Sequence, residues 1–264
     1  MGDRILLIHG AWVGPTCWDS MKARLEAAGF ECQAPAWPYD DRPIADLRAS
    51  PDPALATIGV AEILDRFAGI AGSYPEPPLL VGHSFGGLFV QLLLDRGIGR
   101  AGVAISPAPT RGVFPNLSAL RANALVLRTW RSWKKTLTAG LDEMSWSFFH
   151  GLPEEEQRAA YEAHVIPTPG RPFWQVALAP FNSLTTVDYS NPSRPPLLII
   201  SGESDRTVPA SINQANFEKW KRSSAETEMR KLPGRTHWII AEPGWEEVAD
   251  LVIDFARRHP GSGT

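Results

Sequence analysis

The chain has 264 residues and is 44% hydrophobic, which is enough to bury one large core. Charged residues make up 21% and the net charge is −3, so the composition offers no overall basic field for nucleic acid or an anionic membrane. Cys17 and Cys32 are too few for a disulfide framework, and no apolar run is long enough for a signal sequence or a membrane span. We therefore expect a cytoplasmic monomer or homodimer that binds a small molecule and neither nucleic acid nor membrane.

Short apolar runs alternate with helical patterns at both ends of the chain, which is typical of a parallel sheet covered by helices. The predicted strands are 4–9, 30–35, 78–82, 101–106, 197–201 and 227–232. The predicted helices are 16–28, 58–71, 84–96 and 245–258, and a Pro- and Asp-rich loop follows the second strand through Pro53. The pattern predicts the α/β class, with a mostly parallel sheet of about six strands in a core domain made of residues 1–106 and 196–264.

The alternation stops between residues 107 and 195. This stretch is rich in aromatic residues separated by Pro and Gly, and it falls where it can cover the carboxyl edge of the sheet, the edge at which open α/β sheets bind ligands. We predict a helical cap (lid) insertion over 107–195. Aromatic side chains often line pockets. The candidate substrate-binding residues are Trp12, Trp130, Trp133, Trp146, Phe149 and Trp174.

One motif carries a catalytic signature. Residues 82–86 read Gly-His-Ser-Phe-Gly, a G-x-S-x-G directly after a predicted buried strand and before a predicted helix. In that context the serine occupies a strained turn, so only glycine-sized residues fit two positions on either side of it. The helix N-terminus behind the serine presents N–H groups and positive dipole to a developing oxyanion. The motif predicts Ser84 as a nucleophile.

A serine nucleophile needs a histidine base and a carboxylate that orients this histidine. On the fold that carries this motif, the chain order is serine, acid, histidine. Only His237, in the loop after the last predicted strand, satisfies both the order and the position. The remaining histidines lie in the two loop motifs, in the insertion or in the C-terminal tail: His9, His83, His150, His164 and His259.

The acid is expected in the loop after the strand 197–201, where residues 201–206 read Ser-Gly-Glu-Ser-Asp-Arg. Asp205 can reach His237 from the carboxyl end of that strand, and Glu203 in the same loop competes with it. Asp188 precedes the strand and is a poorer candidate. Position alone favours Asp205 and leaves Glu203 open.

A second oxyanion donor is expected in the loop after the first strand. Residues 8–12 read Ile-His-Gly-Ala-Trp, and the glycine allows a sharp turn of the backbone towards the nucleophile. The expected oxyanion-hole donors are the backbone N–H groups of Ala11 and Phe85, and Trp12 would line the pocket beside them. This chemistry requires no metal and no organic cofactor.

Together these motifs resemble the α/β-hydrolase-fold superfamily over essentially the whole chain. The matching pieces are residues 8–12, 82–87, 202–205 and 233–238. The resemblance implies that Asp205, rather than Glu203, is the acid. It also implies a core without the first two of the usual eight strands, as in the plant methylesterases and hydroxynitrile lyases. A serine at position 84 disfavours the dehalogenase and epoxide hydrolase branches, which use aspartate there.

The expected activity is that of a carboxylesterase-like serine hydrolase. It would cleave an ester-type bond (carboxylic ester, lactone or thioester) of a small to medium, largely apolar substrate through an acyl-enzyme. One alternative is a lyase or C–C bond hydrolase that uses the triad as acid and base. Hydroxynitrile lyases need a lysine near the triad, and none lies between Asp205 and Gln214 or beside His237. The second alternative is a non-enzymatic small-molecule receptor on the same fold.

Overall fold

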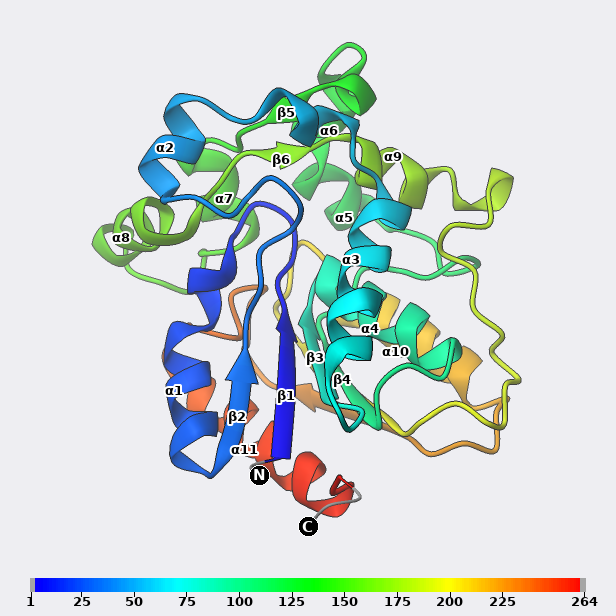
Figure 1. Cartoon of the computed structure of the whole chain (residues 1–264). Helices are drawn as coiled ribbons and strands as arrows, with labels where there is room; N and C mark the ends of the chain where they lie inside the picture. The colour runs from blue at the N-terminus through cyan, green and yellow to red at the C-terminus, as the bar shows by residue number, and fades with distance from the viewer. Residues whose placement is uncertain (1–2, 262–264) are drawn as a thin grey trace.

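The computed structural model describes residues 3–261 and contains a six-stranded sheet in which each strand runs parallel to its neighbours (Figure 1). The strand order is β2-β1-β3-β4-β7-β8. The strands are β1 Asp3–Ile8, β2 Phe30–Gln33, β3 Leu79–His83, β4 Ala101–Ile105, β7 Leu197–Gly202 and β8 Thr227–Leu232. The predicted α/β class and the sheet of about six strands are confirmed.

The three central strands β3, β4 and β7 are buried along their whole length. Their sequences are continuous apolar runs, as expected of strands that are covered on both faces. Leu79 of β3 lies opposite Ala101 of β4, and Gly102 lies opposite Leu197 of β7, so the strands end at the same edge. The carboxyl ends of β3, β4 and β7 therefore lie side by side at one edge of the sheet.

Helices cover both faces of the sheet (Figure 1). α1 (Asp19–Ala27) and α11 (Trp245–Arg258) pack against each other on one face. α3 (Val60–Ser73), α4 (Phe85–Asp95) and α10 (Ala210–Trp220) cover the other face. α4 is buried from its first residue to Leu94, so the helix that follows Ser84 is held rigidly against β3 and β4.

Residues 107–195 form most of the layer above the carboxyl ends of the strands (Figure 1). We call these residues the cap segment. Its elements are α5 Leu117–Ala122, α6 Ala124–Arg128, η3 Ser132–Lys134, β5 Thr136–Leu137, α7 Leu141–Ser147, α8 Glu154–His164, β6 Thr168–Pro169, α9 Arg171–Ala177 and η4 Ala179–Phe181. β5 and β6 pair in antiparallel fashion as a separate two-stranded sheet.

A second stretch of chain contributes to the same layer. The predicted loop before Pro53 contains α2 (Ile44–Ala49), and η2 (Pro53–Thr57) follows it and packs against β6. Arg48 of α2 donates to the carbonyl oxygens of Tyr161 and Val165 at the end of α8. The prediction of an unstructured loop is wrong here, because contacts with the cap segment order a helix too short to be stable alone.

Smaller differences concern the element ends. The predicted helix 16–28 begins as the 3₁₀ turn η1 (Pro15–Trp18) and becomes α-helical only at Asp19. The strand predicted at 30–35 ends at Gln33, while β8 and α11 have the predicted bounds. Within residues 3–261, none of the helices is long and apolar enough to cross a membrane.

Candidate active site

Ser84 stands in the turn between β3 and α4, with φ 56° and ψ −117°. A non-glycine residue at positive φ is strained, and such strain is concentrated at functional sites. The flanking glycines make the turn possible. A Cβ on Gly82 would lie 2.2 Å from the carbonyl oxygen of Gly86, and a Cβ on Gly86 would lie 1.9 Å from that of Ile8. The close packing of this turn therefore requires the G-x-S-x-G pattern.

His237 and Asp205 form a completely buried pair. Nδ1 of His237 lies 2.7 Å from Oδ2 of Asp205. The other carboxylate oxygen, Oδ1, accepts hydrogen bonds from the backbone amides of Thr207 and Val208, at 2.8 Å each. Because the neighbours of this carboxylate are hydrogen-bond donors, Nδ1 of His237 carries a proton and donates a hydrogen bond to Asp205. The loop after β7 thus presents the carboxylate, and the loop after β8 presents the imidazole.

With the proton on Nδ1, the Nε2 atom of His237 is the nitrogen that can accept a proton. It is buried and has no hydrogen-bond partner within the described part of the chain. The His237 ring lies 4.7 Å from the ring of His83, the residue directly before Ser84. Buried polar atoms are normally paired. An unpaired basic nitrogen beside the serine turn is therefore available to accept a proton from a hydroxyl group.

His83 holds the two loops together. Its Nε2 lies 2.9 Å from the backbone oxygen of His237. Burial holds the pKa of His83 well below its usual value, so the ring is neutral and Nε2–H donates to that carbonyl. Phe148 of the cap segment packs edge-on against the His237 ring at 4.5 Å between centroids. The imidazole is thus positioned from the serine turn below and from the cap segment above.

A buried carboxylate that the sequence analysis did not single out orders the histidine loop. Glu242 accepts a hydrogen bond from the backbone amide of Thr236 at 2.9 Å and a second contact from its hydroxyl group. The Thr236 hydroxyl also lies 3.1 Å from the carbonyl oxygen of Phe148. Nothing in the residue pattern marks Glu242, because a carboxylate before a helix is ordinarily an exposed residue.

The competing acid and three of the other histidines contact residues other than Asp205 and His237. The Glu203 carboxylate is exposed and pairs with Lys231 at 3.2 Å. His150 contacts the Ser204 carbonyl, His164 contacts Thr16, and His259 contacts Glu226. Asp205 thus contacts His237 and Glu203 does not, and the role of Asp205 as the acid stays our prediction.

The loop after β1 passes directly against Ser84. A Cβ on Gly10 would lie 2.7 Å from Cβ of Ser84. Ala11 and Phe85 line the same cavity as Ser84. The backbone N–H of Trp12 already donates to the hydroxyl oxygen of Thr168 in the cap segment at 2.8 Å. The amides of Ala11 and Phe85 stay our prediction for the oxyanion hole.

His9 shapes this loop. Burial lowers the pKa of His9 to about 4, so its ring is neutral. Its Nε2 accepts from the backbone amide of Trp37 at 3.2 Å, and its Nδ1 donates to the Gly10 carbonyl at 2.8 Å. Both ring nitrogens are therefore occupied by structural bonds.

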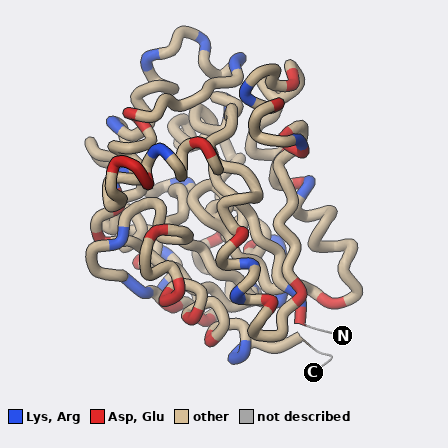
Figure 2. Tube along the Cα trace, turned by 90° about the vertical axis from the view of Figure 1, so that its left-hand side faces the viewer, with Lys and Arg blue, Asp and Glu red and all other residues tan. Residues whose placement is uncertain are grey.

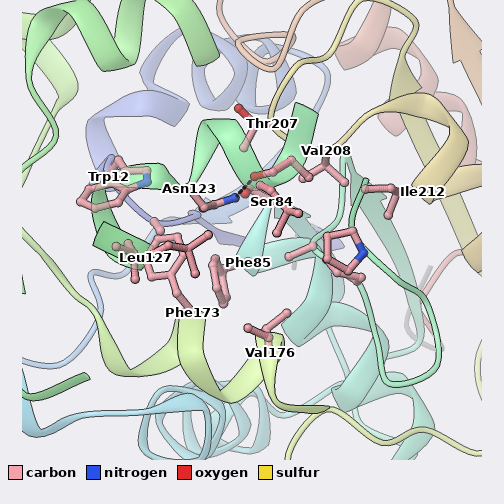
Figure 3. A pocket seen from close by; sticks show the side chains of 18 of the residues that line it. Trp12, Ser84, Phe85, Asn123, Leu127, Phe173, Val176, Thr207, Val208 and Ile212 are labelled. Atoms are coloured by element: carbon pink, nitrogen blue, oxygen red, sulfur yellow. Dashed lines mark hydrogen bonds between the residues drawn. The ribbon is translucent and has the colours of Figure 1, made fainter. Parts of the chain in front are cut away.

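A cavity of about 100 Å³ opens above Ser84 (Figure 3). In the figure Trp12 lies on one side of the serine, Val208 and Ile212 lie on the other, and Phe173 and Val176 lie below. The polar side chains in the lining are Ser84, Asn123 and Thr207, and none of the described lining residues is charged. Most of the lining comes from the cap segment, including Val113, Pro115, Ala119, Leu120, Asn123, Val126, Leu127, Phe148, Phe173, Val176 and Ala177.

Comparison with known proteins establishes the family. A model of the alpha/beta hydrolase family matches residues 5–251. The chain belongs to the alpha/beta hydrolase family. It is 30% identical to Methylesterase 8 of Arabidopsis thaliana over 99 residues, which are 36% of this chain and 34% of the relative. It is 35% identical to Salicylic acid-binding protein 2 of Nicotiana tabacum over 98 residues, 36% and 35% of the two chains. The matched stretch spans about a third of each relative.

Solved structures share the fold over nearly the whole length. The monoacylglycerol lipase of Paleococcus ferrophilus is 21% identical, with a TM-score of 0.68 over 97% of this chain and 95% of that chain. A pyrethroid hydrolase of Sphingobium faniae JZ-2 is 20% identical, with a TM-score of 0.69 over 97% of both chains. At these identities the likeness supports the fold of this alpha/beta hydrolase.

Most of the predicted pocket aromatics lie outside the described cavity lining of this alpha/beta hydrolase, and Trp12 alone of the six is part of it. Trp130 and Trp133 are exposed, and Trp133 packs edge-on against Trp174. Phe149 is fully buried against Trp238. Trp146 is stacked beneath the guanidinium group of Arg121 at 4.0 Å.

The cap aromatics that do line the cavity are Phe148 and Phe173, the immediate neighbours of two predicted residues. Phe173 contacts the rings of Trp12 and Phe85, with centroids 5.2 and 5.0 Å away. Adjacent side chains on a helix point in different directions, so Phe173 of α9 lines the cavity and Trp174 does not. Among residues 3–261, the structure contains no group of three or more His, Cys, Asp or Glu side chains that could hold a metal ion.

Proposed function

We propose that the protein is a serine hydrolase that cleaves an ester-type bond of a small to medium, largely apolar substrate through an acyl-enzyme intermediate. The observation that carries this proposal is the strained Ser84 beside a buried His237–Asp205 pair, at the base of a cavity without charged lining residues. Carboxylic esters, lactones and thioesters share the electrophilic carbonyl carbon that this arrangement can attack.

The reaction proceeds in two acyl-transfer steps. Oγ of Ser84 attacks the carbonyl carbon while Nε2 of His237 takes the hydroxyl proton, and the Ala11 and Phe85 amides stabilise the tetrahedral oxyanion. Nε2–H then protonates the departing alkoxide or thiolate, leaving the acyl group on Ser84. A water molecule gives its proton to Nε2 and attacks the acyl carbon. The acid leaves, and Ser84 regains its proton. Asp205 holds the ring tautomer throughout.

The cavity supports the substrate class. Burying a charged substrate group against this lining would cost free energy, because no described lining residue can compensate it. An uncharged ester with apolar groups would instead gain from burial. The names of a methylesterase, a monoacylglycerol lipase and a pyrethroid hydrolase among the similar proteins also favour an ester.

Two alternatives use the same residues. In a lyase or C–C bond hydrolase, His237 and Ser84 would act as acid and base without an ester substrate. A small-molecule receptor would keep the site but release product slowly or not at all, and one similar protein is named as a salicylic acid-binding protein. The acyl-enzyme reading is supported by the strained Ser84, the buried His237–Asp205 pair and the cavity without charged lining residues.

Hydrolysis of short-chain chromogenic esters by the wild-type chain and Ser84→Ala tests the proposal. We expect sustained turnover by the wild type and a loss of at least about 10³-fold in the variant, with only background catalysis left. Thr207→Ser, a conservative change at the cavity lining, serves as a folded control. A single burst without further turnover in the wild type would favour the receptor instead.

A further inference from the structure

One part of the cap segment carries basic residues and no acidic ones. No Asp or Glu occurs between residues 96 and 141, and six basic residues lie between 111 and 135. All six are exposed: Arg111, Arg121, Arg128, Arg131, Lys134 and Lys135. Because the net charge of the whole chain is −3, the rest of the molecule is acidic. The net charge of the whole chain, from which we expected no membrane partner, does not reveal that residues 111–135 are basic and the remainder is acidic.

Large apolar side chains are exposed among these cations. Leu117 is 84% exposed, Trp130 78% and Phe114 70%, and Leu120, Leu127 and Trp133 are also exposed. Apolar side chains of this size exposed in one segment mark interaction sites more often than ordinary surface. We call residues 111–135 the docking segment.

The docking segment forms part of the cavity wall. Leu120 and Leu127 are both exposed and part of the cavity lining, and Val113 and Pro115 line the cavity on either side of Phe114. The part between α6 and β5 reaches the top of the view in Figure 1, and the loop at the top of Figure 2 carries Lys and Arg without Asp or Glu. Exposed apolar side chains of the docking segment are thus continuous with the apolar lining of the cavity.

We propose that the docking segment binds the surface of an anionic lipid bilayer. Trp and Leu side chains would enter the boundary between headgroups and acyl chains, and the basic side chains would lie against the lipid phosphates. Arg128 pairs with Glu143, and Arg121 is stacked on Trp146. Within the described residues, Arg131, Lys134 and Lys135 take part in no ion pair, so their charges are free to meet an anionic surface.

Charge complementarity distinguishes this partner from a second copy of the chain. A symmetric dimer through the docking segment would bring two cationic surfaces together, and like charges across an interface are repulsive. An anionic bilayer offers the opposite charge and an apolar layer at the same time. Binding to a bilayer would also have a consequence for the site, which rests on the proposed function. An apolar ester dissolved in the bilayer could pass from the lipid into the cavity without crossing water.

Co-sedimentation of the full chain with vesicles tests the proposal. Phosphatidylcholine–phosphatidylglycerol vesicles at low salt should bind the wild type, whereas pure phosphatidylcholine vesicles should bind it much less. Each cation near an anionic bilayer contributes about 1 kcal/mol, about a fivefold change, so Lys134→Gln/Lys135→Gln should weaken partitioning about 25-fold. Trp130→Ala should weaken binding to both vesicle types by removing an apolar contact.

The matched control is Lys221→Gln/Arg222→Gln, which removes two adjacent exposed cations beyond the end of α10 and should leave binding unchanged. Equal losses in the two double variants would overturn the proposal, as would absence of binding to anionic vesicles at low salt. Self-association that Trp130→Ala abolishes, without vesicle binding, would identify a second copy as the partner. Turnover of water-soluble esters should be the same in both double variants. Absence of ester turnover in the wild type would reject the proposed function, but it would not change the result expected for vesicle binding.

Discussion

Single atoms decide what the site can do. The Asp205 carboxylate receives two backbone amides on one oxygen and the His237 ring on the other, so its orientation is fixed before any substrate arrives. This favours in turn the tautomer in which Nε2 of His237 can act as the proposed base. Ser84 is held at positive φ between His83, whose ring lies against that of His237, and the buried helix α4.

Replacing Asp205 by Asn should keep the fold and reduce turnover strongly. The amide would favour the wrong His237 tautomer, an effect of about 10⁴-fold in kcat for the corresponding aspartate of the serine protease triad. Glu203→Gln should reduce kcat by less than about threefold, because Glu203 pairs with Lys231 at the surface. Steady-state kinetics of both variants with one chromogenic ester makes the comparison. If Glu203→Gln were the more damaging change, the assignment of the acid would have to be reversed.

The residues to which we assign chemical roles follow sequence patterns that have a steric or chemical cause. Gly82 and Gly86 are dictated by backbone packing, and His237 follows from chain order. Glu242 could not be predicted, since its burial depends on how the loop after β8 folds onto the cap segment. Phe148 and Phe173 line the cavity instead of their predicted neighbours Phe149 and Trp174, because the aromatic pattern did not define which of two adjacent side chains faces the cavity.

At the scale of elements, the cap segment supplies most of the cavity wall while the strands supply the turn and loops that carry Ser84, Asp205 and His237. The buried strands were predicted well, since a parallel sheet covered on both faces needs continuous apolar runs. The six-residue α2 was missed because Arg48 stabilises it from a distance in sequence, through the carbonyls at the end of α8. Local propensity carries little information about so short a helix.

Phe173 and Trp174 offer a matched test of the cap's role in substrate selection. Phe173→Leu should enlarge the cavity and raise kcat/KM for longer acyl esters relative to acetate esters, by about tenfold or more, since one methylene is worth ~1–3 kcal/mol in an apolar pocket. Trp174→Leu, one position along α9 and outside the described lining, should leave this ratio unchanged. A kinetic series over acyl chain length measures it. Equal shifts in the two variants would show that the cavity lining does not select the acyl group.

On the scale of the whole molecule, the parallel sheet gathers the site. The loops after β1, β3, β7 and β8 all leave the same edge, so residues far apart in sequence, Ala11, Ser84, Asp205 and His237, become neighbours there. The cap segment and α2 lie over that edge (Figure 1), and the side chains of His237 and Asp205 are fully buried. The burial that serves catalysis also encloses groups that have no catalytic role.

Asp40 is one such group. Its Oδ1 atom is buried and has no hydrogen-bond partner among the described residues, and burial raises the pKa of Asp40 to about 8, against a smaller opposing effect of Arg42. An unfolded chain releases this proton near pH 4. The native state therefore binds more protons than the unfolded state between about pH 4 and pH 8, and this group makes the protein less stable as the pH rises through that range.

Asp40→Asn should remove this pH dependence. Relative to the wild type, the variant's free energy of unfolding should increase with pH by at most about 1.4 kcal/mol per unit between pH 4 and pH 8 and should level off above. Urea titrations at several pH values measure the difference, and Asp41→Asn, at a neighbouring exposed residue, is the control. If the difference in free energy of unfolding between Asp40→Asn and the wild type did not change with pH, Asp40 would be ionised in the native protein at all these pH values.

The acyl-enzyme itself provides the most direct measurement of the central claim. The wild-type chain is mixed briefly with an activated short-chain ester, quenched in acid and analysed by intact and peptide mass spectrometry. We predict one added acyl mass on the peptide that contains Ser84, which decays with time, and no such mass in Ser84→Ala. Turnover of the ester without any acyl mass on Ser84, or the same acyl mass on another residue in Ser84→Ala, would contradict the account.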